Sequence, residues 1–208
     1  MQKIDFYFDF LSPFSYFAWK NHQNKLPKDH LEINYKPVLM GKLFSHFDFR
    51  GPGEIEVKRN YELRKCFRYA AKNKIPFLPP KEFPFNPIAL NRCATLFAAK
   101  SEQFKIIDFL FDCVWAHGMI LDDPELIAKI LTENNFSSEV IDLSFERTAK
   151  QELKANIASA ISKNIFGVPT FAVDDEYFWG NDSFDDLNDY LSKNDNWNKE
   201  LYNQLVEK

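Results

Sequence analysis

The chain has 208 residues, of which 45% are hydrophobic and 27% are charged, and its formal net charge is −4. A chain of this length and composition is typical of a globular protein with one sizeable core, which excludes a disordered or membrane-spanning protein. Since no basic block stands out, we expect neither nucleic acid nor a membrane among its partners. The N-terminus lacks the pattern of a signal peptide, so we expect a cytoplasmic protein.

Three cysteines, Cys66, Cys93 and Cys113, lie far apart in the sequence. An odd number of cysteines without a C-x-x-C spacing indicates neither a disulfide framework nor a zinc site. Each cysteine stands in an apolar helical context, so we predict three reduced cysteines in the core and no metal site.

The first elements follow from the periodicity of the apolar side chains. Residues 3–10, KIDFYFDF, alternate in a period of two, which predicts a strand. A helix is predicted over residues 13–25. A second strand is predicted over residues 32–38, EINYKPV, and Pro37 is expected to end it.

A helical block follows. Helices are predicted near residues 55–73, 87–99, 102–117, 124–133 and 138–146. Two of them begin in the same way, because Asn86-Pro87 and Asp123-Pro124 place a capping side chain before a proline. The proline-rich residues 75–85 are expected to form an ordered, extended link.

The C-terminal part returns to strands after a helix near residues 147–164. The segments TFAV and EYFW flank Asp174-Asp175 and predict a hairpin. Asp182 then stands where it could cap a final helix. This order predicts an α/β layer with an all-helical insertion, divided into residues 1–40, 41–148 and 149–208.

Two short motifs are candidates for chemistry. Ser12 and Pro13 satisfy the rule for a helix start, and capping alone explains them. In Gly167-Val168-Pro169-Thr170, a proline directly before a strand is a candidate for a cis peptide bond. Either motif by itself is a weak signal.

Five separated segments carry a resemblance to a known family. They are FYFDFLSPFSYFA, KPVLMGKLF, PFLPPKEFPFNP, FDCVWAHGMILDDPE and FGVPTFAVDDEYFWGND. In this order they resemble the 2-hydroxychromene-2-carboxylate isomerases, relatives of the kappa-class glutathione transferases. The resemblance implies a thioredoxin-like fold with a large all-helical insertion, as in DsbA.

The resemblance also implies a chemistry. Ser12 and Ser15 stand where related redox proteins carry two cysteines, so no dithiol forms and the thiol comes from reduced glutathione. Ser12 would stabilise its thiolate at the helix N-terminus. The thiolate would add to a conjugated hydroxychromene carboxylate, a bond would rotate, and glutathione would leave unchanged.

Site residues are carried over in the same way. Glutathione would be bound by Ser12, Pro13, Phe14, Lys58, Val168, Pro169, Asn181 and Asp182. Lys36, Trp115 and His117 would contact the substrate, although a core position explains Trp115 better, and solvated surface positions explain Lys36 and Lys58 better. The family implies a homodimer.

Two alternatives stay open. The chain could be a kappa-class-like glutathione transferase that acts on electrophiles, or a non-catalytic protein that binds extended peptides or a partner beside Pro169. The second alternative gains from a departure, because residues 49–53 lack a Gly-Asn that many relatives carry and that helps to bind glutathione.

Overall fold

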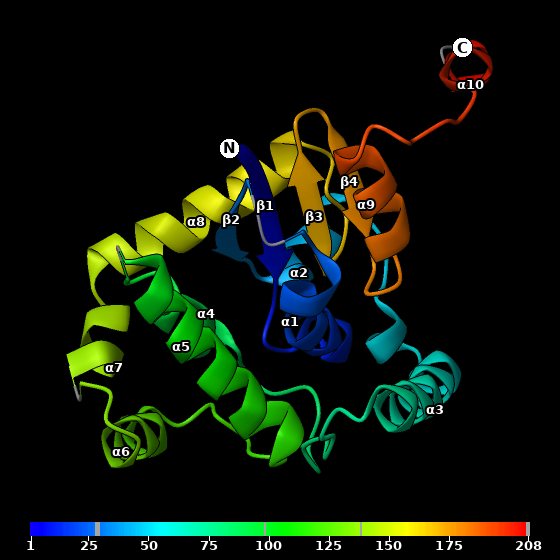
Figure 1. Ribbon diagram of the computed structural model, residues 1–208. Helices are drawn as coiled ribbons and strands as arrows, with labels where there is room; N and C mark the ends of the chain where they lie inside the picture. Colours follow the sequence, from blue (N-terminus) through cyan, green and yellow to red (C-terminus); the bar gives the residue numbers. More distant parts are fainter. Residues whose placement is uncertain (28–29, 98, 138, 207–208) are drawn as a thin grey trace.

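In the computed structural model, which describes residues 1–27, 30–97, 99–137 and 139–206, four strands form one mixed sheet (Figure 1). The strands are β1 (Gln2–Phe8), β2 (Leu31–Pro37), β3 (Thr170–Val173) and β4 (Glu176–Trp179). They lie in the order β2-β1-β3-β4. β1 runs parallel to β2 and antiparallel to β3, and β4 is antiparallel to β3. All four predicted strands are confirmed, although the first ends at Phe8 because a turn begins at Asp9.

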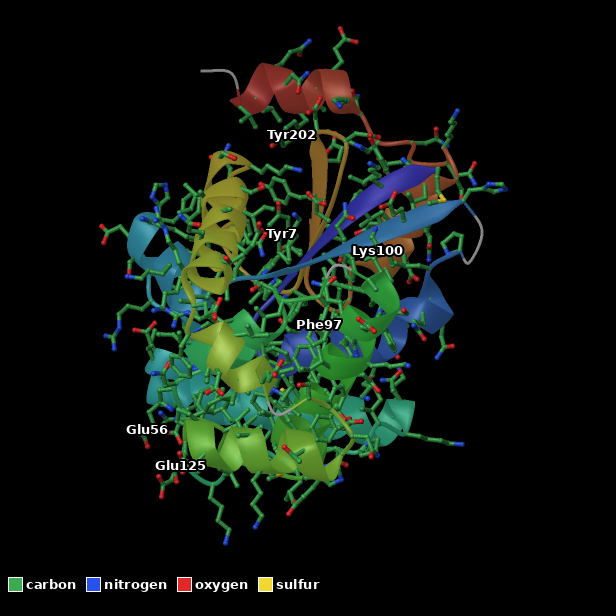
Figure 2. The ribbon with its side chains drawn as sticks, turned by 90° about the vertical axis from the view of Figure 1, so that its left-hand side faces the viewer. Tyr7, Glu56, Phe97, Lys100, Glu125 and Tyr202 are labelled. Atoms are coloured by element: carbon green, nitrogen blue, oxygen red, sulfur yellow. The ribbon has the colours of Figure 1, made fainter. Side chains whose placement is uncertain are left out.

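Helices cover both faces of this sheet. One face carries α1 (Pro13–Lys25) and α9 (Phe184–Leu191), and the other carries α2 (Met40–His46) and α8 (Arg147–Ser162). Successive side chains of β1 point to opposite faces of the sheet, and Phe6 and Phe8 pack against α1. Tyr7 points the other way and shares a hydrogen bond of 2.9 Å with Ser159 of α8. Figure 2 shows Tyr7 between the strands and this helix.

Aromatic rings fill the larger core, on the α1 face. The Phe6 ring stacks on Phe171 of β3 with 4.3 Å between centroids, and Trp19 of α1 stacks on Phe104 of the helical insertion at 4.9 Å. The many phenylalanines of the sequence thus connect the sheet to the insertion.

The insertion lies at the end of the sheet where β1 ends (Figure 1). After α2 come η1 (Pro52–Glu54), α3 (Glu56–Asn73), α4 (Ile88–Cys93), α5 (Lys100–Phe111), the π-helical turn η2 (Asp112–Ala116), α6 (Pro124–Glu133) and α7 (Glu139–Ser144). The helices predicted near 55–73, 102–117 and 124–133 are confirmed, as is the extended link over 75–85. Residues 98 and 138, inside two predicted helices, lie outside the described residues.

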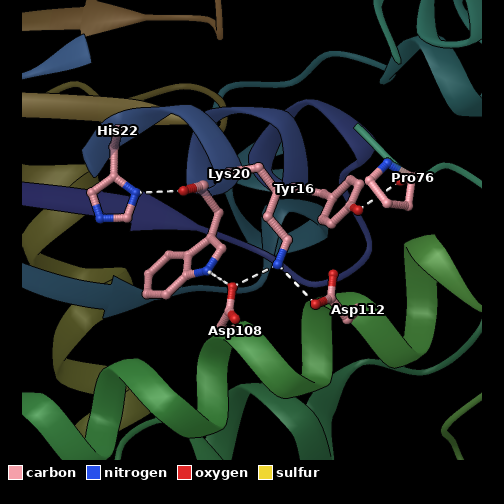
Figure 3. Close-up of polar contacts among 7 residues, drawn as sticks. Tyr16, Lys20, His22, Pro76, Asp108 and Asp112 are labelled. Carbon is pink, nitrogen blue, oxygen red and sulfur yellow. Dashed lines mark hydrogen bonds and ion pairs between the residues drawn. The ribbon is translucent and has the colours of Figure 1, made fainter. Parts of the chain in front are cut away.

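A partly exposed ionic cluster joins α1 to α5 and η2 (Figure 3). The Lys20 ammonium lies 2.6 Å from Asp108 Oδ1 and 2.8 Å from Asp112 Oδ2. Trp19 Nε1 also donates to Asp108, at 2.9 Å. In the same view, the Tyr16 hydroxyl donates to the carbonyl oxygen of Pro76 at 2.6 Å. These contacts fix the insertion against the first helix of the sheet layer.

Three expectations were wrong in detail. The helix predicted over 87–99 ends at Cys93. Asp182 does not cap the helix that follows, because α9 starts after Ser183 and the Asp182 carboxylate is folded back over Gly180. α2 and a C-terminal helix, α10 (Lys199–Val206), were not predicted. Both helices are short, and α10 buries no side chain, so their sequences do not show the apolar periodicity of a helix that packs on the core.

Among the described helices, none combines the length and the apolar character that crossing a bilayer would require.

Candidate functional site

The structure brings the two candidate motifs to one end of the sheet. Tyr7 of β1 lies opposite Thr170 of β3, so Pro169 lies beside the last residues of β1. The chain turns after β1 and starts α1 with Ser12 as its N-cap. Two segments that are about 155 residues apart in sequence therefore lie at the same end of the sheet, the end that faces the insertion.

Ser12 is 4% exposed, and its Oγ accepts the backbone N–H of Ser15 at 3.1 Å. Over residues 1–27, 30–97, 99–137 and 139–206, the Ser12 hydroxyl hydrogen meets no acceptor and the backbone N–H of Phe14 has no partner. The N-terminus of α1 adds a partial positive charge at this point. Ser12 is thus both the predicted cap and a donor that is available to an anion.

The turn before β3 contains a cis peptide bond between Val168 and Pro169, as the sequence predicts. The Thr170 hydroxyl donates to the carbonyl oxygen of Gly167 at 2.8 Å, and the N–H of Gly180 donates to the carbonyl oxygen of Pro169 at 2.9 Å. In the described part of the chain, the N–H and C=O of Val168 have no hydrogen-bond partner. Val168 therefore presents a free N–H donor and a free C=O acceptor, as a residue on an edge strand does.

Asn181 and Asp182 directly follow Gly180, whose N–H donates to Pro169, so they lie at the same end of the sheet. Asn181 is buried, whereas Asp182 is exposed. The backbone of Gly180 has φ +105°, and a Cβ at this position would collide with the Asp182 carboxylate. Glycine is required here because it allows the carboxylate to fold back beside the Pro169 turn.

Trp115 and His117, the predicted substrate contacts from the insertion, differ in placement. Trp115 is 2% exposed, stacks on Phe77, and donates from Nε1 to the carbonyl oxygen of Phe10 at 2.8 Å. It lies in the core and holds the segment just before Ser12. His117 is exposed at the end of η2. Among the described residues, no hydrogen bond joins the His117 side chain to the Ser12 segment.

Lys36 and Lys58 are not brought together. Lys36 pairs in register with Tyr7, so its side chain lies on the α8 face, where it lines a cavity of about 180 Å³ with Glu152 and Asn156. Lys58 is exposed on α3. Two turns further along α3, the Lys65 ammonium lies 5.5 Å from the centroid of the Phe14 ring. This contact places α3 beside the start of α1.

Residues 49–53, which lack the Gly-Asn of many relatives, border an open cleft. The cleft has a volume of about 330 Å³ and is lined by Gly41, Phe44, Ser45, Asp48, Phe49, Arg50 and Glu54. The Arg50 guanidinium donates to the carbonyl oxygen of Glu54 at 3.1 Å. An arginine is thus the polar group that this segment offers in place of the missing asparagine.

The three cysteines are buried and reduced, as predicted. Burial raises the pKa of the Cys66 and Cys93 thiols to about 12 and that of Cys113 to about 11. Thiols of this kind are poor nucleophiles at neutral pH. In the part of the chain that is described, no cluster of three metal-binding side chains occurs.

Sequence reasoning missed one residue beside Ser12. Asp9 is the polar member of an alternating strand pattern, which is ordinarily a solvated position, yet it is 1% exposed. Its partners include Asn91, 82 positions away. No local signal identifies such a pair.

Comparison with known proteins places this geometry in a family. A family model described as DSBA-like thioredoxin domain matches residues 3–192. The chain is 31% identical over 192 residues to the 2-hydroxychromene-2-carboxylate isomerase of Pseudomonas putida, an alignment that covers 86% of this chain and 89% of the relative. It is 22% identical over 206 residues to glutathione S-transferase kappa 2 of Caenorhabditis elegans, with 91% and 92% covered.

A solved structure agrees. The structure of a 2-hydroxychromene-2-carboxylate isomerase superimposes with a TM-score of 0.81 at 26% identity, covering 99% of this chain and 98% of that chain. The predicted thioredoxin-like fold with a helical insertion is confirmed. The chain belongs to the DSBA-like thioredoxin domain family and, within it, to the family of enzymes named 2-hydroxychromene-2-carboxylate isomerases.

Proposed function

We propose that this protein is a glutathione-dependent isomerase of the 2-hydroxychromene-2-carboxylate type. The observation that carries the proposal is the Ser12 hydroxyl, which is fixed at a helix N-terminus with its hydrogen free to donate. Such a donor favours a thiolate over a thiol. Since all three cysteines of the chain are buried, the thiol must come from outside.

The residues at this end of the sheet fit a tripeptide such as glutathione. The unpaired N–H and C=O of Val168 would bind its extended backbone, as an added strand would be bound. The exposed Asp182 carboxylate suits the ammonium group of the γ-glutamyl end, with Asn181 beside it. Pro13 and Phe14 would border the sulfur, and Lys58 and Lys65 on α3 supply positive charge for carboxylates.

When bound, glutathione would supply the nucleophile for reversible addition to a conjugated substrate. Ser12 would donate a hydrogen bond to the sulfur and hold it at the positive end of α1. We keep Lys36 and His117 as proposed contacts of the substrate carboxylate and ring. Trp115 acts through the segment that it holds at Phe10 rather than by lining a pocket.

Kappa-class transferase activity is a second candidate, favoured by the similarity to the transferase of Caenorhabditis elegans. The same thiolate would then attack an electrophile and stay bonded to it. A third candidate, a non-catalytic binder of extended peptides, is supported by the same unpaired groups of Val168. A homodimer and a cytoplasmic location also stay predictions, and light scattering of the purified protein tests the first.

The decisive experiment is a calorimetric titration of reduced glutathione and of S-methylglutathione into the wild type, Ser12→Ala and Ser15→Ala. We expect the wild type to bind both peptides, with a depressed thiolate pKa for reduced glutathione. Ser12→Ala should lose that depression and most of the turnover of 2-hydroxychromene-2-carboxylate. Ser15→Ala should keep both, because the backbone N–H that contacts Ser12 is retained and the Ser15 side chain makes only a long contact of 3.5 Å with the N–H of Asp9.

The alternatives give different results. Formation of a stable conjugate with a chloronitrobenzene, without isomerase turnover, would indicate a transferase. Absence of glutathione binding to the folded wild type would contradict both enzymatic proposals and leave the peptide-binding protein.

A further inference from the structure

Asp9 is a buried carboxylate at the end of β1, three residues before Ser12. Three N–H groups converge on its two oxygens. The N–H of Leu11 donates to Oδ1 at 3.1 Å, the N–H of Met40 donates to Oδ2 at 2.8 Å, and Asn91 Nδ2 donates to Oδ1 at 2.8 Å. The first donor belongs to the Ser12 segment, the second to the start of α2, and the third to α4.

The backbone of Asp9 contacts the Ser12 segment as well. Its carbonyl oxygen accepts the N–H of Ser12 at 3.0 Å, and its N–H points to Ser15 Oγ at 3.5 Å. Asp9 therefore holds both ends of the turn that starts α1, while its side chain anchors that turn to the start of α2 and to α4 of the insertion. Asp9 is thus one of the residues that determine the position of Ser12 Oγ, together with Trp115 and the N–H of Ser15.

The chemistry of the pocket requires a carboxylate. A group that accepts three N–H donors on two oxygens cannot be replaced by an amide, which has a single acceptor oxygen. Burial raises the pKa of Asp9, so the ionised form is opposed by desolvation and is favoured by these same three donors. Asn91 Oδ1 is buried and finds no partner among the described residues, so the bond to Asp9 is the one hydrogen bond that the Asn91 side chain makes there.

Asp9 could act on a thiolate at Ser12 in two ways, and the two predict opposite changes of the thiolate pKa when Asp9 is removed. If Asp9 acted on the sulfur through its charge, the carboxylate would oppose a second negative charge nearby, and removing it would lower the thiolate pKa. If it acts by fixing the turn, removing it would loosen the Ser12 donor and raise that pKa. The geometry favours the second explanation, since all three donors to the carboxylate are structural.

We propose that Asp9 is a positioning residue, which holds the Ser12 hydroxyl at the start of α1 by tying residues 9–12 to Met40 and Asn91. Its effect on turnover rests on the proposed function of Ser12. The anchoring of residues 9–12 to Met40 and Asn91 can be measured in the protein without any ligand.

The test compares Asp9→Asn with Asp5→Asn in the full chain. Asp5 lies in the middle of β1, four residues before Asp9, where it contacts Asn34 at 3.0 Å and Lys163 at 3.4 Å. Asn91→Ala provides a milder variant, which keeps the carboxylate and removes one donor. Hydrogen exchange of the Ser12 and Ser15 amides is followed by NMR, together with kcat, KM and the thiolate pKa of bound glutathione.

We expect exchange at Ser12 and Ser15 to become about tenfold faster in Asp9→Asn, with a smaller change in Asn91→Ala and none in Asp5→Asn. kcat should fall by about tenfold and the thiolate pKa should rise. Unchanged exchange in Asp9→Asn, or a lower thiolate pKa, would overturn the proposal. If Asp9→Asn does not fold, Asn91→Ala decides by the same criteria.

A failure of the proposed function gives a different result. A wild type that binds no glutathione would contradict the role of Ser12, whereas faster exchange in Asp9→Asn and Asn91→Ala would still establish the tie.

Discussion

The Ser12 hydroxyl accepts the backbone N–H of Ser15 at 3.1 Å, and this contact separates two roles of Ser12. Accepting the N–H stabilises the start of α1. Donating the hydroxyl hydrogen is a second property, which the cap does not use. Substitutions at residue 12 can therefore remove one role and keep the other.

We predict that Ser12→Ala lowers the free energy of unfolding by about 1 kcal/mol, because the N-cap is lost, and also abolishes most turnover. Ser12→Asp should keep nearly wild-type stability, because aspartate is an equally good cap, but it should be just as inactive, since a carboxylate donates no hydrogen bond to a thiolate. Urea unfolding and isomerase assays check both. An active Ser12→Asp enzyme would contradict the donor role.

His22 makes stability depend on pH. It is fully buried, its Nδ1 lies 2.5 Å from the carbonyl oxygen of Trp19, and its Nε2 lies 3.3 Å from the Tyr35 hydroxyl. Burial lowers the pKa of His22 to about 4. The unfolded chain takes up a proton near pH 6.5, but the folded chain does so only near pH 4, so the stability present above pH 6.5 is lost as the pH falls.

We expect this loss to reach about 3 kcal/mol between pH 6.5 and pH 4. Unfolding by urea at several pH values measures it in the wild type and in His22→Gln. The difference between the two proteins should shrink steadily as the pH falls. His46→Gln, at an exposed position of α2, is the control and should follow the wild type. A constant difference between the wild type and His22→Gln would refute the prediction.

Lys20 is the next test, because it joins the sheet layer to the insertion. Its side chain is 20% exposed and bridges Asp108 and Asp112, which are more accessible to water. We predict that Lys20→Met lowers the free energy of unfolding by about 1 kcal/mol, a value reduced for solvent screening. Lys129→Met, which breaks an exposed pair at 3.9 Å from Glu133, should change it by less than about 0.5 kcal/mol. Equal effects of the two changes would argue against a structural role of the Lys20 cluster.

Local patterns were sufficient to predict most of the fold. The alternation of β1, the cap and proline of α1 and α6, and the turn before β3 are all encoded within a few neighbouring residues, and each element is found where it was predicted. The helices that were missed have no apolar stripe from which a pattern could be recognised, since α10 buries no residue and α2 buries only Leu43.

The site was predictable only in part. Local geometry predicted the cap at Ser12 and the cis bond before Pro169, the resemblance to the isomerase family made them site candidates, and the sheet register places them at the same end of the sheet. Asp9 was not found, because its importance comes from Met40 and Asn91, which the fold alone brings near. For Trp115 the core position was the better explanation from the sequence, and the structure places it in the core.

The last prediction tests the environment of residue 12 without glutathione. The wild-type protein should react with no more than a trace of a thiol reagent while folded, because Cys66, Cys93 and Cys113 are buried and burial raises the pKa of each thiol. Ser12→Cys would place one thiol at the N-terminus of α1, beside the free N–H of Phe14. We expect that thiol to have a pKa below about 8.5, the value of an ordinary cysteine. The pH dependence of alkylation measures it, with the exposed variant Ser45→Cys as the control. A pKa equal to that of the control would mean that this helix start does not stabilise a thiolate, and the glutathione proposal would lose its physical basis.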